Sequence, residues 1–167
     1  MRLKRNNILA NYLSLLGVRH TESFSGQYFN EHPHKHNLFE LSKMLSDYNV
    51  ENGAIRIEDK QNDIQEIQTP FIAQFGGDFV AVYKVETQCI ASQSENVSFF
   101  WKGVNHVLPV AKFIEAWTGI MLLAESSEKS IEPGYKEHKK TEQISLLKNI
   151  VFFWQSRKVI KEFLEVP

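Results

Sequence analysis

The fold is decided by residues 69–85, which read Thr69-Pro-Phe-Ile-Ala-Gln-Phe-Gly-Gly-Asp-Phe-Val-Ala-Val-Tyr-Lys-Val85. Two runs rich in β-branched and aromatic residues flank Gly76-Gly77, a pair that is typical of a tight hairpin turn. The run after the turn alternates between two unlike faces, one made of Phe79, Ala81, Tyr83 and Val85 and the other of Val80, Val82 and Lys84. The stretch therefore predicts an antiparallel hairpin with strands at Thr69–Phe75 and Asp78–Val85.

Helical patterns precede this hairpin, and further strand patterns accompany it. Apolar residues recur at helical spacing from Leu3 to Gly17, a C-cap candidate, and a second helical stretch covers residues 22–30. Asn37 is placed to cap a third helix, with Glu40 three residues later in the capping-box position. Short strands are expected at 53–57, 88–91, 97–101, 106–108 and 120–124, and short helical segments at 59–67 and 111–117. Helices followed by antiparallel strands are typical of an α+β fold.

The composition is that of a folded domain with no strong charge bias. The 167 residues are 43% hydrophobic, and 19 basic residues nearly balance 20 acidic ones. Because nucleic-acid-binding proteins carry a basic excess, no nucleic acid partner is expected. Cys89 is the only cysteine, which excludes an internal disulfide and a thiolate metal cluster. No cofactor is expected, and no segment has the ~20 apolar residues that a membrane span requires.

The chain is expected to hold one domain and a tail. The polar run Glu125–Ser130 and the pair Pro133-Gly134 mark a boundary. Residues 1–124 would form the domain, 125–134 a linker and 135–167 a helical tail. The tail carries an apolar stripe of Ile144, Leu147, Ile150, Val151 and Trp154. This stripe could pack on the domain, mediate self-association or lie on a membrane surface.

Three segments in series resemble one family of enzymes. They are the Leu38–Leu45 helix, which follows an opening helix that ends in Leu-Gly, the hairpin from Thr69 to Val82, and Pro109–Leu123 with its Phe-x-x-x-Trp-x-Gly pattern. In this order they resemble the peptidase domain of bacteriocin-exporting ABC transporters, which cuts leader peptides after a double glycine. The resemblance covers about residues 3–124. It implies a papain-like cysteine peptidase fold, with N-terminal helices packed on an antiparallel sheet.

The catalytic residues of that family are missing at the matching positions. The mechanism needs a cysteine at the start of the first helix, a histidine at the start of the hairpin's second strand and an aspartate that orients the imidazole. Asp78 occupies the histidine position. The cysteine position falls on one of Lys4, Arg5, Asn6 and Asn7, and the aspartate position falls on Phe99 or Phe100. The resemblance therefore implies a catalytically inactive, peptidase-like domain.

A narrower resemblance concerns three phrases, Tyr28–Lys35, Ser42–Tyr48 and Lys129–His138. They are similar to Bacteroidetes membrane proteins in which a peptidase-like domain precedes a vitamin K epoxide reductase-type membrane domain and often a thioredoxin-like one. This resemblance implies a detached N-terminal domain in the cytoplasm, at the inner face of the bacterial inner membrane, with a peptide or a membrane protein as its partner. The enzyme chemistry of those proteins belongs to Cys-x-x-Cys pairs, which this chain lacks.

Several single residues leave alternatives open. His32, His34 and His36 could present imidazoles to zinc or nickel, or form a solvated loop before the third helix. Asp78 could act as a catalytic carboxylate or accept hydrogen bonds at a turn. Cys89 could be a buried apolar residue or a nucleophile. We expect a binding module linked to leader-peptide export or to membrane thiol oxidation, with an active cysteine-type peptidase that cleaves double-glycine leaders as the alternative.

Overall fold

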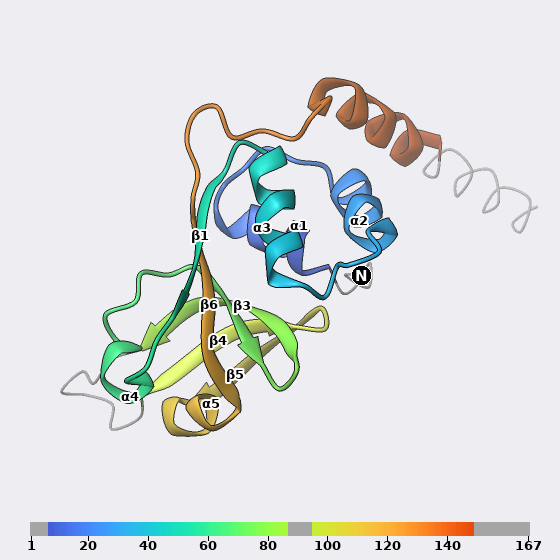
Figure 1. The fold of residues 1–167 in the computed structure, drawn as a ribbon. Helices are drawn as coiled ribbons and strands as arrows, with labels where there is room; N and C mark the ends of the chain where they lie inside the picture. Colours follow the sequence, from blue (N-terminus) through green and yellow to red (C-terminus); the bar gives the residue numbers. More distant parts are fainter. Residues whose placement is uncertain (1–6, 87–94, 149–167) are drawn as a thin grey trace, which may run out of the picture. The chain divides into compact units, whose positions relative to one another are not determined.

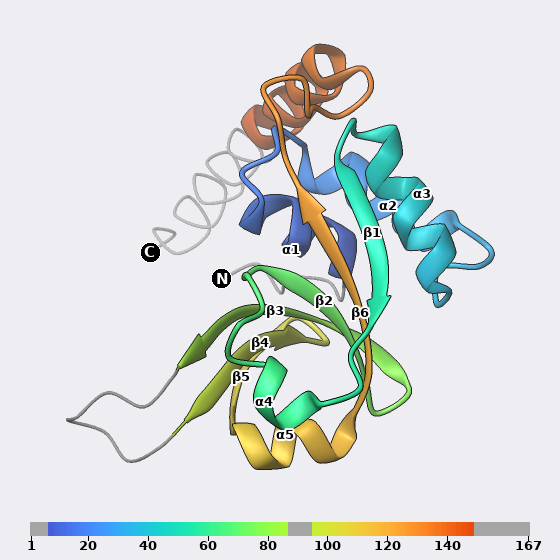
Figure 2. The same ribbon diagram turned by 60° about the vertical axis from the view of Figure 1, so that its left-hand side comes forward.

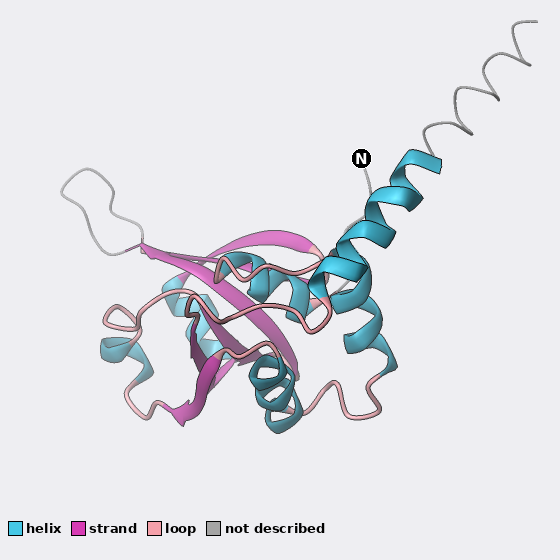
Figure 3. Ribbon diagram, turned by 90° about the horizontal axis from the view of Figure 1, so that it is seen from above, coloured by secondary structure: helices cyan, strands magenta, loops and turns pink. Residues whose placement is uncertain are grey.

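The computed structural model describes residues 7–86 and 95–148, and the chain divides into two compact units, residues 1–133 and 134–167. The first unit combines three N-terminal helices with a sheet (Figures 1 and 2). Figure 3 distinguishes its helices in cyan from its strands in magenta. Within the described residues, every helix is too short or too polar to span a bilayer.

The three predicted N-terminal helices are present: α1 (Ile8–Leu15), α2 (Glu22–Glu31) and α3 (Leu38–Asp47). Asn37 caps α3, because its side chain accepts a hydrogen bond from the N–H of Phe39 at 3.0 Å. The expected capping box is wrong in one respect. The N–H of Asn37 donates to the carbonyl of His34, so the turn before the helix already uses the donor that Glu40 would have bonded.

One antiparallel sheet follows, in the strand order β1-β6-β2-β3-β4-β5. Its strands are β1 (Glu51–Arg56), β2 (Phe71–Phe75), β3 (Asp78–Glu86), β4 (Asn96–Trp101), β5 (Val104–Pro109) and β6 (Trp117–Glu125). The predicted hairpin is confirmed as β2 and β3, which pair Phe75 with Asp78 across the turn. Two short helices, α4 (Lys60–Asp63) and α5 (Val110–Ala116), lie in the connections. The strand expected at 88–91 lies outside the described residues.

Both faces of the sheet are buried at its centre, which differs from the expected pair of unlike faces. Residues Phe79–Val82 are at most 8% exposed. Phe79 and Ala81 pack with residues of α1 and α3, whereas Val80 and Val82 belong to a second cluster that includes residues of α5. A strand covered on both sides carries apolar residues on both sides, so its sequence alternates only weakly.

Residues 126–132, within the segment expected as a linker, make hydrogen bonds to the N-terminal part of the first unit. Ser126 Oγ donates to the carbonyl of Leu16 at 2.7 Å. Glu132 is 1% exposed and accepts hydrogen bonds from the backbone and side chain of Thr21. The chain therefore stays attached to the first unit as far as Glu132.

The second unit contains a helix at residues 135–148. Two members of the expected apolar stripe are described there, and they are well exposed: Ile144 at 44% and Leu147 at 62%. The other members, Ile150, Val151 and Trp154, lie outside the described residues. The pairing of this stripe therefore stays a prediction.

The phenol of Tyr28 on α2 provides a test of how α2 packs on α3. Its hydroxyl donates to Asp47 Oδ2, and burial, followed by the hydrogen bond and the charge of Asp47, raises the pKa of Tyr28 to about 12. Because that carboxylate disfavours a phenolate, we expect Asp47→Asn to lower the pKa of Tyr28. Tyrosinate absorbance measured against pH follows the change, and Tyr28→Phe identifies the transition that belongs to this residue. An unchanged transition in Asp47→Asn would contradict the contact.

Candidate functional site

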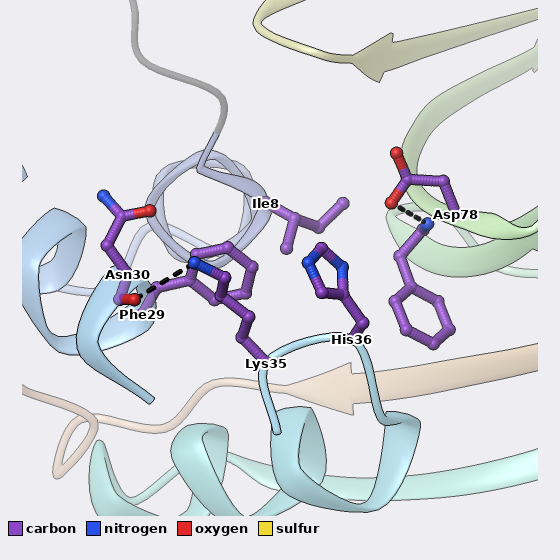
Figure 4. Close-up of a pocket in the computed structure, with 7 residues that line it drawn as sticks. Ile8, Phe29, Asn30, Lys35, His36 and Asp78 are labelled. Atoms are coloured by element: carbon purple, nitrogen blue, oxygen red, sulfur yellow. Dashed lines mark hydrogen bonds between the residues drawn. The ribbon is translucent and has the colours of Figure 1, made fainter. Parts of the chain in front are cut away.

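A pocket of about 260 Å³ is formed where four segments meet. These segments are α1, the end of α2, the loop before α3 and the start of β3 (Figure 4). The lining residues are Ile8, Phe29, Asn30, Lys35, His36, Asp78 and Phe79. Apolar walls and ionisable side chains share this space, which is the usual composition of a ligand site.

Asp78 is held at the pocket by two hydrogen bonds. The Gly76-Gly77 turn has φ angles of 57° and 81°, a conformation that glycine adopts readily, and it makes Asp78 the first residue of β3. Asp78 Oδ1 accepts a hydrogen bond from the N–H of Phe79 at 2.8 Å, and Oδ2 accepts one from Trp101 Nε1 at 3.2 Å. Both carboxylate oxygens are thus oriented by the protein. The indole of Trp101 is a partner that no sequence pattern indicates.

The start of α1 is capped by an amide side chain. Asn7 is 5% exposed, and its Oδ1 accepts a hydrogen bond from the N–H of Ala10 at 3.3 Å. Helix α2 approaches closely at Gly26, where an added methyl group would lie 3.3 Å from Asn7 Nδ2. Asn7 therefore acts as the N-cap that begins the helix. The other candidates for the cysteine position, Lys4, Arg5 and Asn6, lie outside the described residues.

The phenylalanines at the candidate aspartate position belong to different clusters of the core. Phe99 is fully buried, and its ring centroid lies 5.2 Å from that of Phe75 in the cluster that α5 covers. Phe100 packs against the cluster that α1 and α3 cover, with its ring 5.1 Å from that of Tyr83. Neither phenylalanine lines the pocket. Their side chains serve packing on the two sides of β4.

The three histidines of the loop before α3 have different surroundings. His32 Nε2 lies 3.5 Å from Glu40 Oε2, and the N–H of His34 donates to His32 Nδ1 at 3.3 Å. His36 lines the pocket. In the part of the chain that the structure describes, no three histidine, cysteine or acidic side chains are grouped as metal ligands. His36 is therefore best described as a pocket residue, a role that the alternating pattern does not indicate.

The pocket's side chains can bind and can exchange protons, but they include no hydroxyl or thiol. Asp78 and His36 are acid–base groups, and Lys35 adds an ammonium group. None of the seven lining residues is serine, threonine or cysteine, the residues that commonly act as nucleophiles in covalent catalysis by hydrolases. Cys89 lies outside the described residues. The seven lining residues thus offer charged and acid–base groups to a ligand, and no side-chain nucleophile is among them.

The helices and the antiparallel sheet form a papain-like α+β fold, which solved peptidase domains share. No protein-family model matches the chain, and no curated protein does. Among the solved structures that match its fold are three peptidase domains. One is a double glycine motif protease from an AMS/PCAT transporter, in complex with the leader peptide, with a TM-score of 0.58 and 17% identity. The match covers 76% of this chain and 88% of that one.

The other two are peptidase domains as well. The peptidase domain of Streptococcus ComA, a bi-functional ABC transporter involved in quorum sensing, has a TM-score of 0.56 and 12% identity over 76% of this chain and 95% of that one. The N-terminal peptidase C39-like domain of a toxin secretion ATP-binding protein from Vibrio parahaemolyticus has a TM-score of 0.53 and 15% identity, covering 76% and 99%. At these identities the comparisons establish the fold, and they confirm the expected papain-like α+β architecture.

Proposed function

We propose that this chain is a catalytically inactive, peptidase-like domain that binds an extended peptide, or a segment of a membrane-protein partner, in the pocket beside α1. The observation that carries the proposal is the pocket itself. It retains apolar walls and oriented polar groups, whereas its lining has no hydroxyl or thiol nucleophile. Ligand binding needs apolar walls and oriented polar groups, which the pocket has. A cysteine-type peptidase also needs a nucleophile, which the lining of the pocket does not supply.

The surroundings of the family's three catalytic positions support the same proposal. A cysteine peptidase lowers the thiol pKa at a helix start and activates the thiol with a histidine. Among the candidate positions that the structure describes, Asn7 uses its side chain to cap α1, and Asp78 accepts hydrogen bonds from Phe79 and Trp101. Phe99 and Phe100 both pack in the core. Each side chain already has a structural task. Because the rate of such enzymes collapses when any triad member is lost, three replacements favour a binding role.

Titration calorimetry with synthetic double-glycine leader peptides tests the proposal. We expect binding without turnover, and a loss of about tenfold or more in affinity when the exposed pocket residue Asn30 is replaced by tryptophan. Asn105→Trp, at an exposed position on β5, is the matched control and should bind like the wild type. If neither leader peptides nor a cognate membrane-protein segment bind, the proposed function is wrong.

An active peptidase is the second candidate, and the presence of His36 and Asp78 in one pocket favours testing it. The two side chains could supply acid–base catalysis to a nucleophile from elsewhere in the chain. Mass spectrometry of leader peptides incubated with the protein detects any cleavage. An active enzyme requires cleavage that disappears in Asp78→Asn, His36→Gln or Cys89→Ala. Product formation no faster than in buffer would dispose of this candidate.

A further inference from the structure

We infer that the pocket binds the free C-terminal carboxylate of a peptide, and not an internal peptide segment. The inference rests on the proposed function, because it specifies which part of a peptide the domain recognises. It follows from the charges that line the pocket and from how they are distributed within it.

Two basic residues lie on the loop before α3. Lys35 and His36 both line the pocket. Lys35 Nζ donates to the backbone carbonyl of Asn30 at 3.1 Å, which holds the ammonium group at the wall with a neutral partner. Among the described residues, neither side chain forms an ion pair with a carboxylate. An ammonium group has three donors and one positive charge, so an anionic ligand could occupy the donors that remain.

Basic and acidic side chains lie at different ends of the pocket. Figure 4 shows Lys35 beside Asn30 on one side and Asp78 on the other, with the imidazole of His36 between them. Asp78 already accepts hydrogen bonds from Phe79 and Trp101. The pocket therefore has a basic side chain, Lys35, at one end and an acidic side chain, Asp78, at the other. A peptide terminus matches this arrangement with its carboxylate towards Lys35 and its last amide N–H towards Asp78.

The pocket is small and partly apolar. Its volume of about 260 Å³ lies just below the ~300–1,000 Å³ of pockets that enclose whole small-molecule ligands. Ile8, Phe29 and Phe79 supply apolar walls. The space therefore suits the end of a chain. The backbone of an internal segment would bring only neutral peptide groups to Lys35, and a partly desolvated charge is stabilised best by an opposite charge.

The experiment compares two synthetic peptides that end in Gly-Gly and differ only at the terminus, one a free acid and the other a carboxamide. We expect the acid to bind at least about tenfold more tightly in calorimetry. Lys35→Met should reduce this preference to nearly one, and His36→Gln should reduce it in part. Lys43→Met is the matched control, since Lys43 is 58% exposed and pairs with Glu40; it should keep the preference. Thermal unfolding of each variant verifies that it is folded.

Each other outcome has a defined meaning. Equal binding of acid and carboxamide by the wild type would overturn the inference and leave the proposed function standing, whereas failure of both peptides to bind counts against the proposed function. A preference that survives Lys35→Met would also overturn the inference. A third peptide, a carboxamide that ends in aspartate, carries its carboxylate on a side chain. We expect it to bind like the plain carboxamide, and binding as tight as that of the acid would overturn the assignment to the chain terminus.

Discussion

Gly119→Ala is expected to lower the free energy of unfolding by about 2–5 kcal/mol. Gly119 lies in β6, the strand between β1 and β2, with a φ of +83°. A left-handed conformation costs a residue with a side chain about 1–2 kcal/mol. A Cβ would also lie 2.5 Å from the carbonyl oxygen of Ile57, so further strain of about 1–3 kcal/mol is expected from the overpacking. The backbone there cannot retreat freely, because the N–H of Ile57 donates to the carbonyl of Gly119 at 2.8 Å.

Denaturant-induced unfolding measures this loss as a shift in the transition midpoint. Gly53→Ala is the matched control, since Gly53 lies in the neighbouring strand β1 and a Cβ there would meet no atom within 4 Å. Its effect should stay within about ±0.5 to 1 kcal/mol. Unfolding of Gly119→Ala at the same denaturant concentration as Gly53→Ala would show that β6 does not approach Ile57 as closely as described.

The elements of the fold follow from local sequence signals, but the covering of the sheet does not. Turn glycines, an asparagine N-cap and helical spacing are encoded within a few residues, so α3 and the β2–β3 hairpin are predictable. Burial of both faces at Phe79–Val82 depends on α5, which comes later in the chain. Alternation of apolar and polar residues identifies a strand with one buried face, but a strand that is buried on both faces shows little alternation.

The candidate site is predictable only where the family pattern reaches it. Asp78 is found at the pocket because the hairpin turn fixes its place at the start of β3. Lys35 and Asn30 come from the loop before α3 and the end of α2, and no local pattern indicates that they line the same pocket. Trp101 bonds to Asp78 across 23 positions of the sequence. Such contacts are set by tertiary packing, which a single sequence does not report.

Glu132→Ala is expected to destabilise the first unit by about 2–4 kcal/mol, although the residue lies in a segment with the composition of a linker. Its carboxylate accepts hydrogen bonds from the N–H of Thr21 at 2.6 Å and from Thr21 Oγ1 at 3.0 Å. Ser25 Oγ lies 3.4 Å from the same carboxylate and 2.9 Å from the hydroxyl of Tyr48. Thr21 is the N-cap of α2 but makes no side-chain capping bond within the helix. Glu132 instead accepts from the N-cap residue itself, from a distant part of the chain, and its charge suits the helix N-terminus.

Truncation to alanine leaves the buried donors of Thr21 without this acceptor, which is why the cost exceeds that of an ordinary hydrogen bond. Glu128→Ala is the matched control, because Glu128 is exposed in the same segment and its loss should change stability by no more than about 0.5 kcal/mol. Glu132→Gln should fall between the two, since it keeps the shape and an acceptor but loses the charge. Equal stability of Glu132→Ala and Glu128→Ala would mean that the carboxylate does not hold Thr21 at the start of α2.

A double-mutant cycle with Thr21→Ala separates the capping interaction from the packing of the segment. If the two side chains act on each other, the double variant should be more stable than the sum of the single losses implies, by about 0.5–3 kcal/mol.

The end of α2 supplies Phe29 and Asn30 to the pocket. Loosening the start of this helix at Thr21 should therefore also weaken peptide binding, while Glu128→Ala leaves it unchanged. Stability that falls without any loss of affinity would show that the cap holds the fold and that the pocket wall keeps its place independently of it.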